Sequence, residues 1–233
     1  MHRIEALLQA DRPVIWLFAG DSITQGAVHT RGWRDYTQLF RERLGESARN
    51  EDVVINTAVG GWSLRPLAAR LEERVLRFRP DAVFFLFGTN DAAGGPEGLD
   101  GFRATYADVV GRVLQAGVVA VVLQTTVPLM PLDLGSLAAM GMPAGKLEGV
   151  RRRLACLPDF VEATRQVAAD LDVPLVDHWA VWQQVGFRVG QLSEGLFHAN
   201  EYGHRLLART LLRACGLWDE ASWTCRQFIA ADV

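Results

Sequence analysis

Residues 14–26 read VIWLFAGDSITQG and join a short apolar run directly to a polar turn. The run Val14–Ala19 is rich in β-branched and aromatic residues and follows Pro13, which is typical of a buried strand in a parallel sheet. Gly20 permits a tight turn after this strand. Ser22 is therefore predicted at the carboxyl end of a strand, where open α/β sheets place their ligands. A serine there is a candidate nucleophile if a base reaches it, but Asp21 or Ser22 could equally serve only to cap a helix.

The same strand-and-helix alternation continues along the chain. Apolar runs predict further strands, and helical periodicity predicts the segments between them. The predicted strands are 53–56, 82–87, 118–124 and 173–176, and the predicted helices are 2–10, 32–44, 64–78, 99–115 and 200–213. This alternation predicts an α/β fold of three layers, with a five-stranded parallel sheet covered by helices on both faces. No repeat or low-complexity linker interrupts it, so one domain over 1–233 is expected.

The composition is that of an ordinary globular protein. The 233 residues are 49% hydrophobic and 22% charged, with a formal charge of −3, which argues against a nucleic-acid partner. Three cysteines without paired spacing indicate neither a zinc site nor a disulfide framework, and Lys146 is the single lysine. No apolar stretch reaches the roughly 18 residues of a membrane span, and the first residues lack signal-peptide features. A cytoplasmic location is therefore expected.

Two segments depart from the alternation. Residues 125–158 contain four prolines and three methionines and follow the fourth predicted strand, on the face where Ser22 should lie. Long irregular segments are usually functional or mobile, so this one is either a substrate-side flap or a surface excursion packed on the body. The tryptophan-containing tail 216–233 could pack on its own body or on a neighbouring copy, which leaves a homo-oligomer open.

Four polar segments are expected to meet at one edge of the sheet, and together they resemble the GDSL, or SGNH, hydrolase family. The matching blocks are GDSITQG at 20–26, INTAVGG at 55–61, GTND at 88–91, and HAN at 198–200 followed by Gly203. The resemblance extends over 13–212. It implies the flavodoxin-like SGNH hydrolase fold and an esterase or lipase-like activity, for which no metal or cofactor is needed.

Acyl transfer requires a nucleophile, a base and donors for the developing oxyanion. Ser22 is the candidate nucleophile, and His198 is the candidate base because a neutral imidazole can take the serine proton. The backbone N–H of Gly61 and the side-chain amide of Asn90 are the candidate oxyanion donors. Gly61 is preferred to Gly60 by counting along the motif, and the N–H of Ser22 is a third option.

The last block departs from the family pattern, which has an aspartate three residues before the catalytic histidine. Gly195 occupies that place here, and the nearest carboxylate is Glu194. We expect Glu194 to complete a triad with Ser22 and His198, while a Ser–His dyad with the imidazole held by a backbone carbonyl stays open. His29 and Trp62 are candidate pocket residues; the aromatic side chains expected in the core are Trp33, Trp179 and Trp182.

These observations predict a serine esterase that hydrolyses a small-molecule carboxylic ester through an acyl-enzyme. Short-chain acyl or O-acetyl esters, including those of carbohydrates, are the favoured substrates, and lysophospholipase or thioesterase activity is the alternative. A non-catalytic small-molecule binding module and a flavin or nucleotide binder belong to a different class, since fold does not fix function. The sequence lacks GxxxxGK[ST] and GxGxxG motifs, which disfavours the nucleotide binder.

Overall fold

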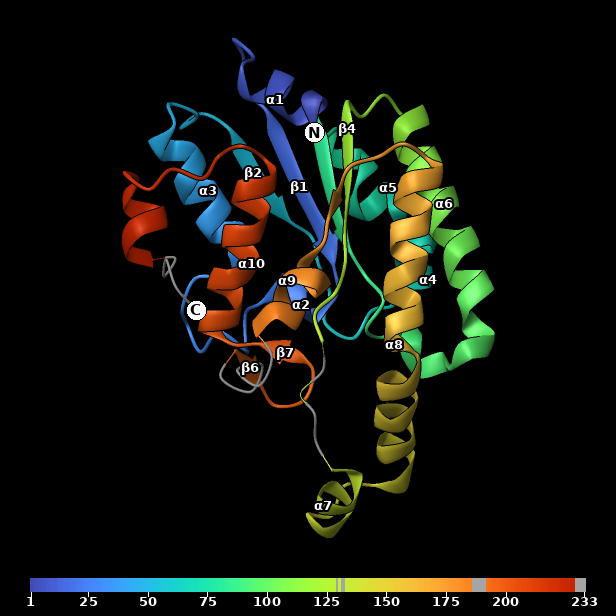
Figure 1. The fold of residues 1–233 in the computed structure, drawn as a ribbon. Helices are drawn as coiled ribbons and strands as arrows, with labels where there is room; N and C mark the ends of the chain where they lie inside the picture. Colours follow the sequence, from blue (N-terminus) through green and yellow to red (C-terminus); the bar gives the residue numbers. More distant parts are fainter. Residues whose placement is uncertain (129, 131–132, 186–191, 229–233) are drawn as a thin grey trace.

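A single parallel sheet forms the centre of the protein, seen in a computed structural model that describes residues 1–128, 130, 133–185 and 192–228 (Figure 1). Its strand order is β2-β1-β3-β4-β5. The strands are β1 (Ile15–Gly20), β2 (Val53–Asn56), β3 (Ala82–Leu86), β4 (Ala120–Gln124) and β5 (Leu175–Val176). This order is that of flavodoxin-like folds, so the predicted five-stranded parallel α/β architecture is confirmed.

Strand β1 lies where the strand order reverses, with β2 on one side and β3 on the other. Gly20, the last residue of β1, is paired with Leu86 at the end of β3. In open α/β sheets, the crevice outside the carboxyl ends at such a switch point is the usual place for a ligand. The turns that follow β1 and β3 are therefore brought together there.

Helices cover both faces of the sheet, so the fold has three layers (Figure 1). One layer contains α1 (His2–Leu8), α3 (Tyr36–Glu46), α9 (His178–Val185) and α10 (Glu201–Ala214), and the other contains α4 (Leu64–Ala69), α5 (Leu71–Arg74), α6 (Leu99–Gln115) and α8 (Ala144–Asp170). Short elements complete the described chain: α2 (Ser22–Gln25), α7 (Leu134–Ala139), the hairpin strands β6 (Ser193–Glu194) and β7 (His198–Ala199), the 3-10 turns Leu76–Phe78, Asp91–Gly94 and Pro96–Gly98, and a π-helical turn at Thr224–Phe228.

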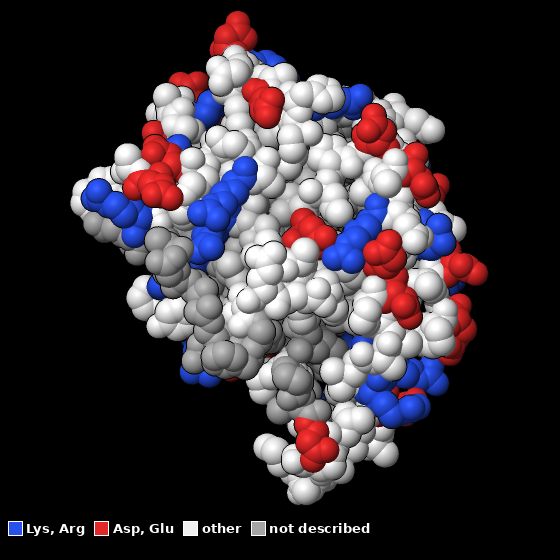
Figure 2. Space-filling view, viewed as in Figure 1, with Lys and Arg blue, Asp and Glu red and all other residues white. Residues whose placement is uncertain are grey.

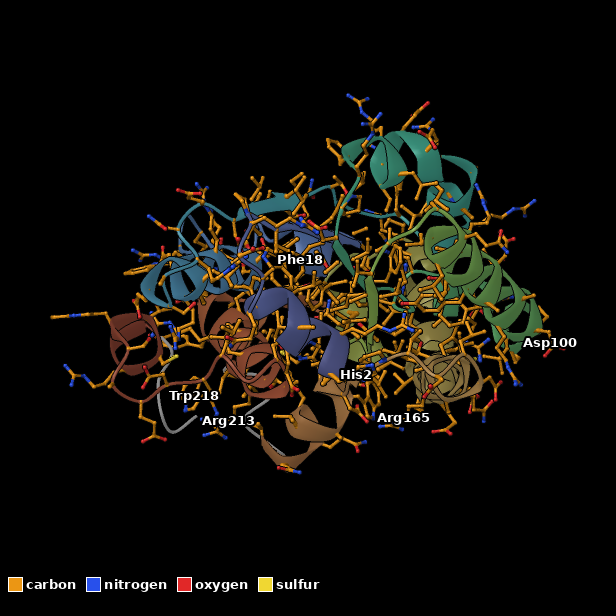
Figure 3. All side chains as sticks on the ribbon, turned by 90° about the horizontal axis from the view of Figure 1, so that it is seen from above. His2, Phe18, Asp100, Arg165, Arg213 and Trp218 are labelled. Atoms are coloured by element: carbon orange, nitrogen blue, oxygen red, sulfur yellow. The ribbon has the colours of Figure 1, made fainter. Side chains whose placement is uncertain are left out.

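Each sheet face has its own core because successive side chains of a strand point to opposite faces. Phe84 of β3 stacks on Phe18 at 4.6 Å between ring centroids, on the face of α3 and α10. Its neighbour Phe85 packs toward the other layer, against Tyr106 of α6. Figure 3, seen from above, places Phe18 between the two helical layers.

Some expected elements differ in detail. The helix predicted over 64–78 is divided into α4, α5 and a 3-10 turn, and α3 continues through Gly45 to Glu46. Trp179 and Trp182 are buried as expected, but the expectation for Trp33 is wrong: its side chain is 55% exposed, and the guanidinium of Arg205 lies over its ring.

Most of the described part of the segment 125–158 is helical rather than an irregular loop. Residues 134–139 form α7, and from Ala144 onward the chain is already in α8, a helix of 27 residues that continues past Pro158. Figure 1 shows α7 and the first turns of α8 extending beyond the body as an arm, at the same end of the molecule as the β6–β7 hairpin. Lys146 lies exposed in the first turn of α8, on this arm. The role of this arm as a substrate-side flap stays a prediction.

The tail packs on the chain's own body up to Thr224–Phe228. The backbone N–H and hydroxyl of Thr224 both donate to Glu46 of α3, at 2.8 and 2.6 Å.

Cys156, Cys215 and Cys225 are buried free thiols. None of the described helices combines the length and apolarity that crossing a bilayer requires. Figure 2 shows acidic and basic side chains interspersed over the visible face.

Candidate active site

The two ends of the domain meet at the carboxyl edge of the sheet. Strand β1 ends at Gly20, and Ser22 begins α2, whose first turn is capped by Asp21 accepting the N–H of Ile23 at 2.8 Å. His198 reaches the same point from β7, with Nε2 2.9 Å from the Ser22 Oγ. Both side chains are half-buried. The predicted nucleophile and base are thus within hydrogen-bond distance although 176 residues separate them.

Gly20 is required for close packing rather than for a special backbone conformation. A Cβ at this position would lie 2.3 Å from the Thr24 Oγ1 and 2.9 Å from the Leu86 carbonyl oxygen. Any larger residue would push α2 away from β3. The absence of a side chain here lets Ser22 approach the end of the neighbouring strand.

The glycine pair after β2 lies beside Ser22. The N–H of Val59 donates to the Gly20 carbonyl at 3.1 Å, which carries the β1–β2 pairing up to the turn. The N–H of Gly60 is occupied by Gln25 Oε1 at 3.1 Å. In the described part of the chain, the N–H of Gly61 takes part in no hydrogen bond, and its φ of +80° turns the peptide. The N–H of Gly61, rather than that of Gly60, is therefore the unbonded donor of the pair, and its role at an oxyanion stays a prediction.

Asn90 follows β3 and is fixed by two contacts that require the same orientation of its amide. Its Nδ2 donates to the Trp62 carbonyl at 2.9 Å, and its Oδ1 accepts from Arg153 Nη2 at 3.3 Å. A carbonyl only accepts and a guanidinium only donates, so the nitrogen and oxygen of the amide are distinguished. Among the described residues, the second Nδ2 hydrogen has no acceptor.

The structure does not give Glu194 the predicted contact with His198. The two residues are paired across the β6–β7 hairpin, but both carboxylate oxygens of Glu194 accept from Arg31 Nη2, at 2.9 and 2.8 Å. Gly195 forms the hairpin turn with a φ of +64°, a conformation that disfavours the family's aspartate at this place. Because Arg31 occupies the carboxylate, the geometry lacks the third member of a triad at Glu194.

His29 lies flat against His198. The two rings are stacked with centroids 3.4 Å apart and planes 5° from parallel, so His29 does line the site. Burial lowers the pKa of His198 to about 4, with the His29 and Arg153 charges adding to the effect and Glu194 opposing it. Burial likewise lowers the pKa of His29. The imidazole of His198 is thereby kept in its neutral, proton-accepting form.

Two buried aspartates support the turns around Ser22. Asp91 accepts the N–H groups of Leu64 and Gly88, at 2.9 and 3.2 Å, and burial raises its pKa to about 6. Burial also raises the pKa of Asp21 to about 7. These carboxyl groups hold loop backbone, as expected, and their raised pKa values reduce the negative charge beside Ser22.

Two further histidines, His178 and His204, are structural. His178 Nε2 lies 3.0 Å from Gln124 Oε1, and His204 Nδ1 accepts the N–H of Tyr36 at 3.2 Å. Both rings are fully buried, and burial lowers the pKa of each to about 3. They therefore pack as neutral core groups behind the catalytic edge.

An open cavity of about 470 Å³ adjoins Asn90. Its lining residues come from the α4 and α6 ends and the turn between β3 and α6: Ser63, Leu64, Arg65, Asn90, Asp91, Gly94, Gly98, Gly101, Phe102 and Thr105. Trp62, a predicted pocket wall, is not among the residues that line this cavity, and its ring lies under the guanidinium groups of Arg70 and Arg74, at 5.5 and 5.2 Å.

The comparisons with known proteins agree with this fold. The acetylxylan esterase Axe2 of Geobacillus stearothermophilus has a similar structure, with a TM-score of 0.69 and 23% identity over 87% of this chain and 94% of its own. LAE5, an α/β hydrolase from the metagenome of Lake Arreo in Spain, has a TM-score of 0.70 and 20% identity over 91% and 99% of the two chains.

In sequence, the chain is 29% identical over 171 residues to the uncharacterized lipoprotein YqeF of Bacillus subtilis, covering 69% of this chain and 68% of that protein. The sequence model of the GDSL-like lipase/acylhydrolase family matches residues 18–206. This span contains all four motif blocks, and the elements that carry them converge on Ser22 and His198. The chain belongs to the GDSL-like lipase/acylhydrolase family.

Proposed function

We propose that this ester hydrolase uses Ser22 as its nucleophile and His198 as its general base. The observation that carries the proposal is the 2.9 Å distance between the Ser22 Oγ and the His198 Nε2. At this distance, a neutral imidazole accepts the hydroxyl proton as the oxygen attacks. The lowered pKa of His198 supports the proposal, because the ring is then unprotonated at neutral pH.

In the first step, the Ser22 Oγ attacks the ester carbonyl carbon and its proton passes to His198 Nε2. The carbonyl oxygen becomes an oxyanion, which accepts hydrogen bonds from the N–H of Gly61 and from the free Nδ2 hydrogen of Asn90. Collapse of this intermediate breaks the bond to the alcohol, which leaves with the proton from His198. Water, deprotonated by His198, then attacks the acyl-Ser22 and releases the carboxylic acid.

We infer that the site works as a Ser–His dyad. The carboxylate of Glu194 is engaged by Arg31, and its influence on His198 is through space only. Structures of the Axe2 esterase include catalytic mutants at a serine, a histidine and an aspartate. In this chain, the aspartate position of the family motif is Gly195, so the chemistry depends on the serine and histidine.

The substrate we propose is a small acyl ester, with O-acetyl groups on a carbohydrate as the leading class. The cavity reaches Asn90 but is not lined by Ser22 or His198, so it would receive a part of the substrate beyond the ester group. Its lining places Arg65 and Thr105 beside Phe102, which suits a polar alcohol portion more than a long acyl chain. The name of the similar Axe2 structure, an acetylxylan esterase, supports the same class.

Turnover of p-nitrophenyl acetate by the purified protein tests the reaction, with Ser22→Ala as the variant. We expect Ser22→Ala to lose at least about 1000-fold in kcat, because the covalent route is closed while the fold is kept. A profile of p-nitrophenyl esters from acetyl to decanoyl, alongside acetylated xylose, then tests the substrate class. Activity that rises with chain length would point instead to a lysophospholipase or thioesterase. Unchanged turnover by Ser22→Ala would refute the mechanism.

A further inference from the structure

Arg153 of helix α8 contacts the residue proposed as an oxyanion donor. Its Nε donates to the Thr89 carbonyl at 3.0 Å, and its Nη2 donates to the Asn90 Oδ1 at 3.3 Å. The planar guanidinium thus spans a backbone and a side-chain acceptor of adjacent residues. A lysine would not reproduce this geometry, since its donors share one nitrogen, whereas the guanidinium donates from two nitrogens in a rigid plane.

The contact restrains the amide of Asn90 from the side opposite to its other partner. Arg153 holds the Oδ1, while the Trp62 carbonyl holds one Nδ2 hydrogen at 2.9 Å. With both ends held, rotation of the amide is blocked and the remaining Nδ2 hydrogen has a fixed direction. An oxyanion donor is effective only when it is oriented before the reaction, so this restraint has a catalytic consequence.

The same guanidinium also contacts the histidine segment. It lies over the ring of Phe197, 4.9 Å from the centroid, and Phe197 directly precedes His198. Cation–π contacts of this kind are favourable, more so when partly removed from water. One side chain on α8 therefore contacts the GTND segment and the residue that precedes His198.

Arg153 occupies a costly place for a charge. It is half-buried, burial lowers its pKa, and no ion pair with a carboxylate is found for it among the described residues. Its neighbours Arg151 and Arg152 differ, because both pair with the exposed Glu148. Desolvating a guanidinium without a paired carboxylate is unfavourable, so its hydrogen bonds at the site must offset that cost.

We propose that Arg153 is a positioning residue that orients the Asn90 amide toward the oxyanion. The proposal rests on the proposed function, because it assigns a role within the same reaction. Arg153 itself touches no reacting atom. Its action passes through Asn90, and that dependence can be measured.

The first test compares Arg153→Met with the matched control Arg151→Met, which removes the same charge two residues away on α8. We expect Arg153→Met to lower kcat for p-nitrophenyl acetate by about 10- to 100-fold with KM changed less than about threefold, since misplacing a catalytic group by about 1 Å can cost 100-fold. Arg151→Met should keep its kcat within about twofold. Thermal unfolding verifies that each variant is folded. If Arg153→Met fails to fold, Arg153→Lys replaces it, because lysine keeps the charge but loses the bidentate geometry.

The second test is a double-mutant cycle with Asn90→Ala. Because Arg153 acts through Asn90, Arg153→Met should cost less than about threefold once Asn90 is already alanine. If the two losses multiply, or if Arg153→Met is as active as the control, the positioning role is overturned. Ser22→Ala separates this outcome from failure of the proposed function: an inactive Ser22→Ala with multiplying losses removes only the role of Arg153.

Discussion

His198 is surrounded so that it stays uncharged. Its ring is packed against His29 and lies near the positive charge of Arg153, and burial is the largest cause of its lowered pKa. An exposed histidine titrates near 6.5 and would be partly protonated at neutral pH. Here the charged form is disfavoured before any substrate binds.

The pH dependence of kcat/KM should reflect this. Because the folded-state pKa of His198 is lowered to about 4, the base form is lost only as the pH falls through that value, so the loss of activity toward acid should be centred near pH 4. Ionisation of Asp91 and Asp21, whose pKa values are about 6 and 7, has the opposite sign, because it adds negative charge beside the oxyanion and lowers activity as the pH rises. Rates measured between pH 3.5 and 8, with unfolding monitored at each pH, test this. An acidic limb centred at 6.5 or above would contradict it.

Substitution of Glu194 should have a small effect. Its carboxylate is held by Arg31, so Glu194→Gln removes an exposed ion pair and no hydrogen bond to the base. We expect kcat/KM to fall less than about tenfold, whereas loss of a triad carboxylate costs about 10,000-fold in kcat. Arg31→Gln is the control, since it breaks the same ion pair from the other side. A much larger loss for Glu194→Gln than for Arg31→Gln would restore the triad.

Single residues were predictable from sequence where a motif places them at the end of a strand. Ser22 and Asn90 follow this rule after β1 and β3, whereas His198 was predicted from its place just before the last helix, α10. The partner of Glu194 was not predictable, because Arg31 lies 163 residues away and only the fold brings it near. Arg153 was missed within the run Arg151–Arg153, although its spacing of three from Val150 and four from Leu157 places it on the buried stripe of α8.

At the scale of elements, α8 was not predicted because it contains Pro158. Pro158 suggested an irregular segment because proline removes a helical hydrogen bond and costs about 3 kcal/mol in a helix interior. The helix nevertheless continues, since Leu157, Phe160 and Val161 are buried against the sheet layer. Burial of these side chains offsets the free-energy cost of Pro158 in the helix. The sequence pattern alone does not show this tertiary burial.

The hairpin that carries His198 depends on close packing with α10. A Cβ on Gly203 would lie 2.3 Å from the Leu192 carbonyl oxygen and 2.9 Å from the Ala199 Cβ. Gly203→Ala should therefore destabilise the protein by about 1–3 kcal/mol and lower kcat by displacing the hairpin. The control is Gly111→Ala in α6, where nothing lies within 4 Å and alanine should stabilise the helix by about 0.5–1 kcal/mol. Denaturant unfolding and esterase assays measure both; equal stabilities would contradict the packing argument.

For the whole molecule, the decisive property is that the sheet is buried on both faces. This much was predictable, because continuous apolar runs such as 82–86 are typical of strands covered on two sides. The split of the 64–78 helix and the arm formed by α7 were not, since neither has a distinct local signal. Substrate, cytoplasmic location and oligomeric state stay predictions.

The two cores should contribute comparably to stability. Phe84 and Phe85 are adjacent in β3, both fully buried, and face opposite layers. Each substitution by alanine should lower the free energy of unfolding by about 3–5 kcal/mol. Denaturant unfolding of the two variants tests this. A loss under 1 kcal/mol for either one would mean that its face of the sheet is not covered as described.

Lys146 allows the arm to be labelled chemically. As the only lysine of the chain, exposed at the start of α8, it offers amine-reactive reagents a single side chain to modify. A fluorophore coupled there would sit on the projecting end of the helix that carries Arg153 seven residues further on. Its anisotropy could then be followed while an inhibitor occupies the serine, which would reveal whether the arm responds to acylation without altering any group in the crevice.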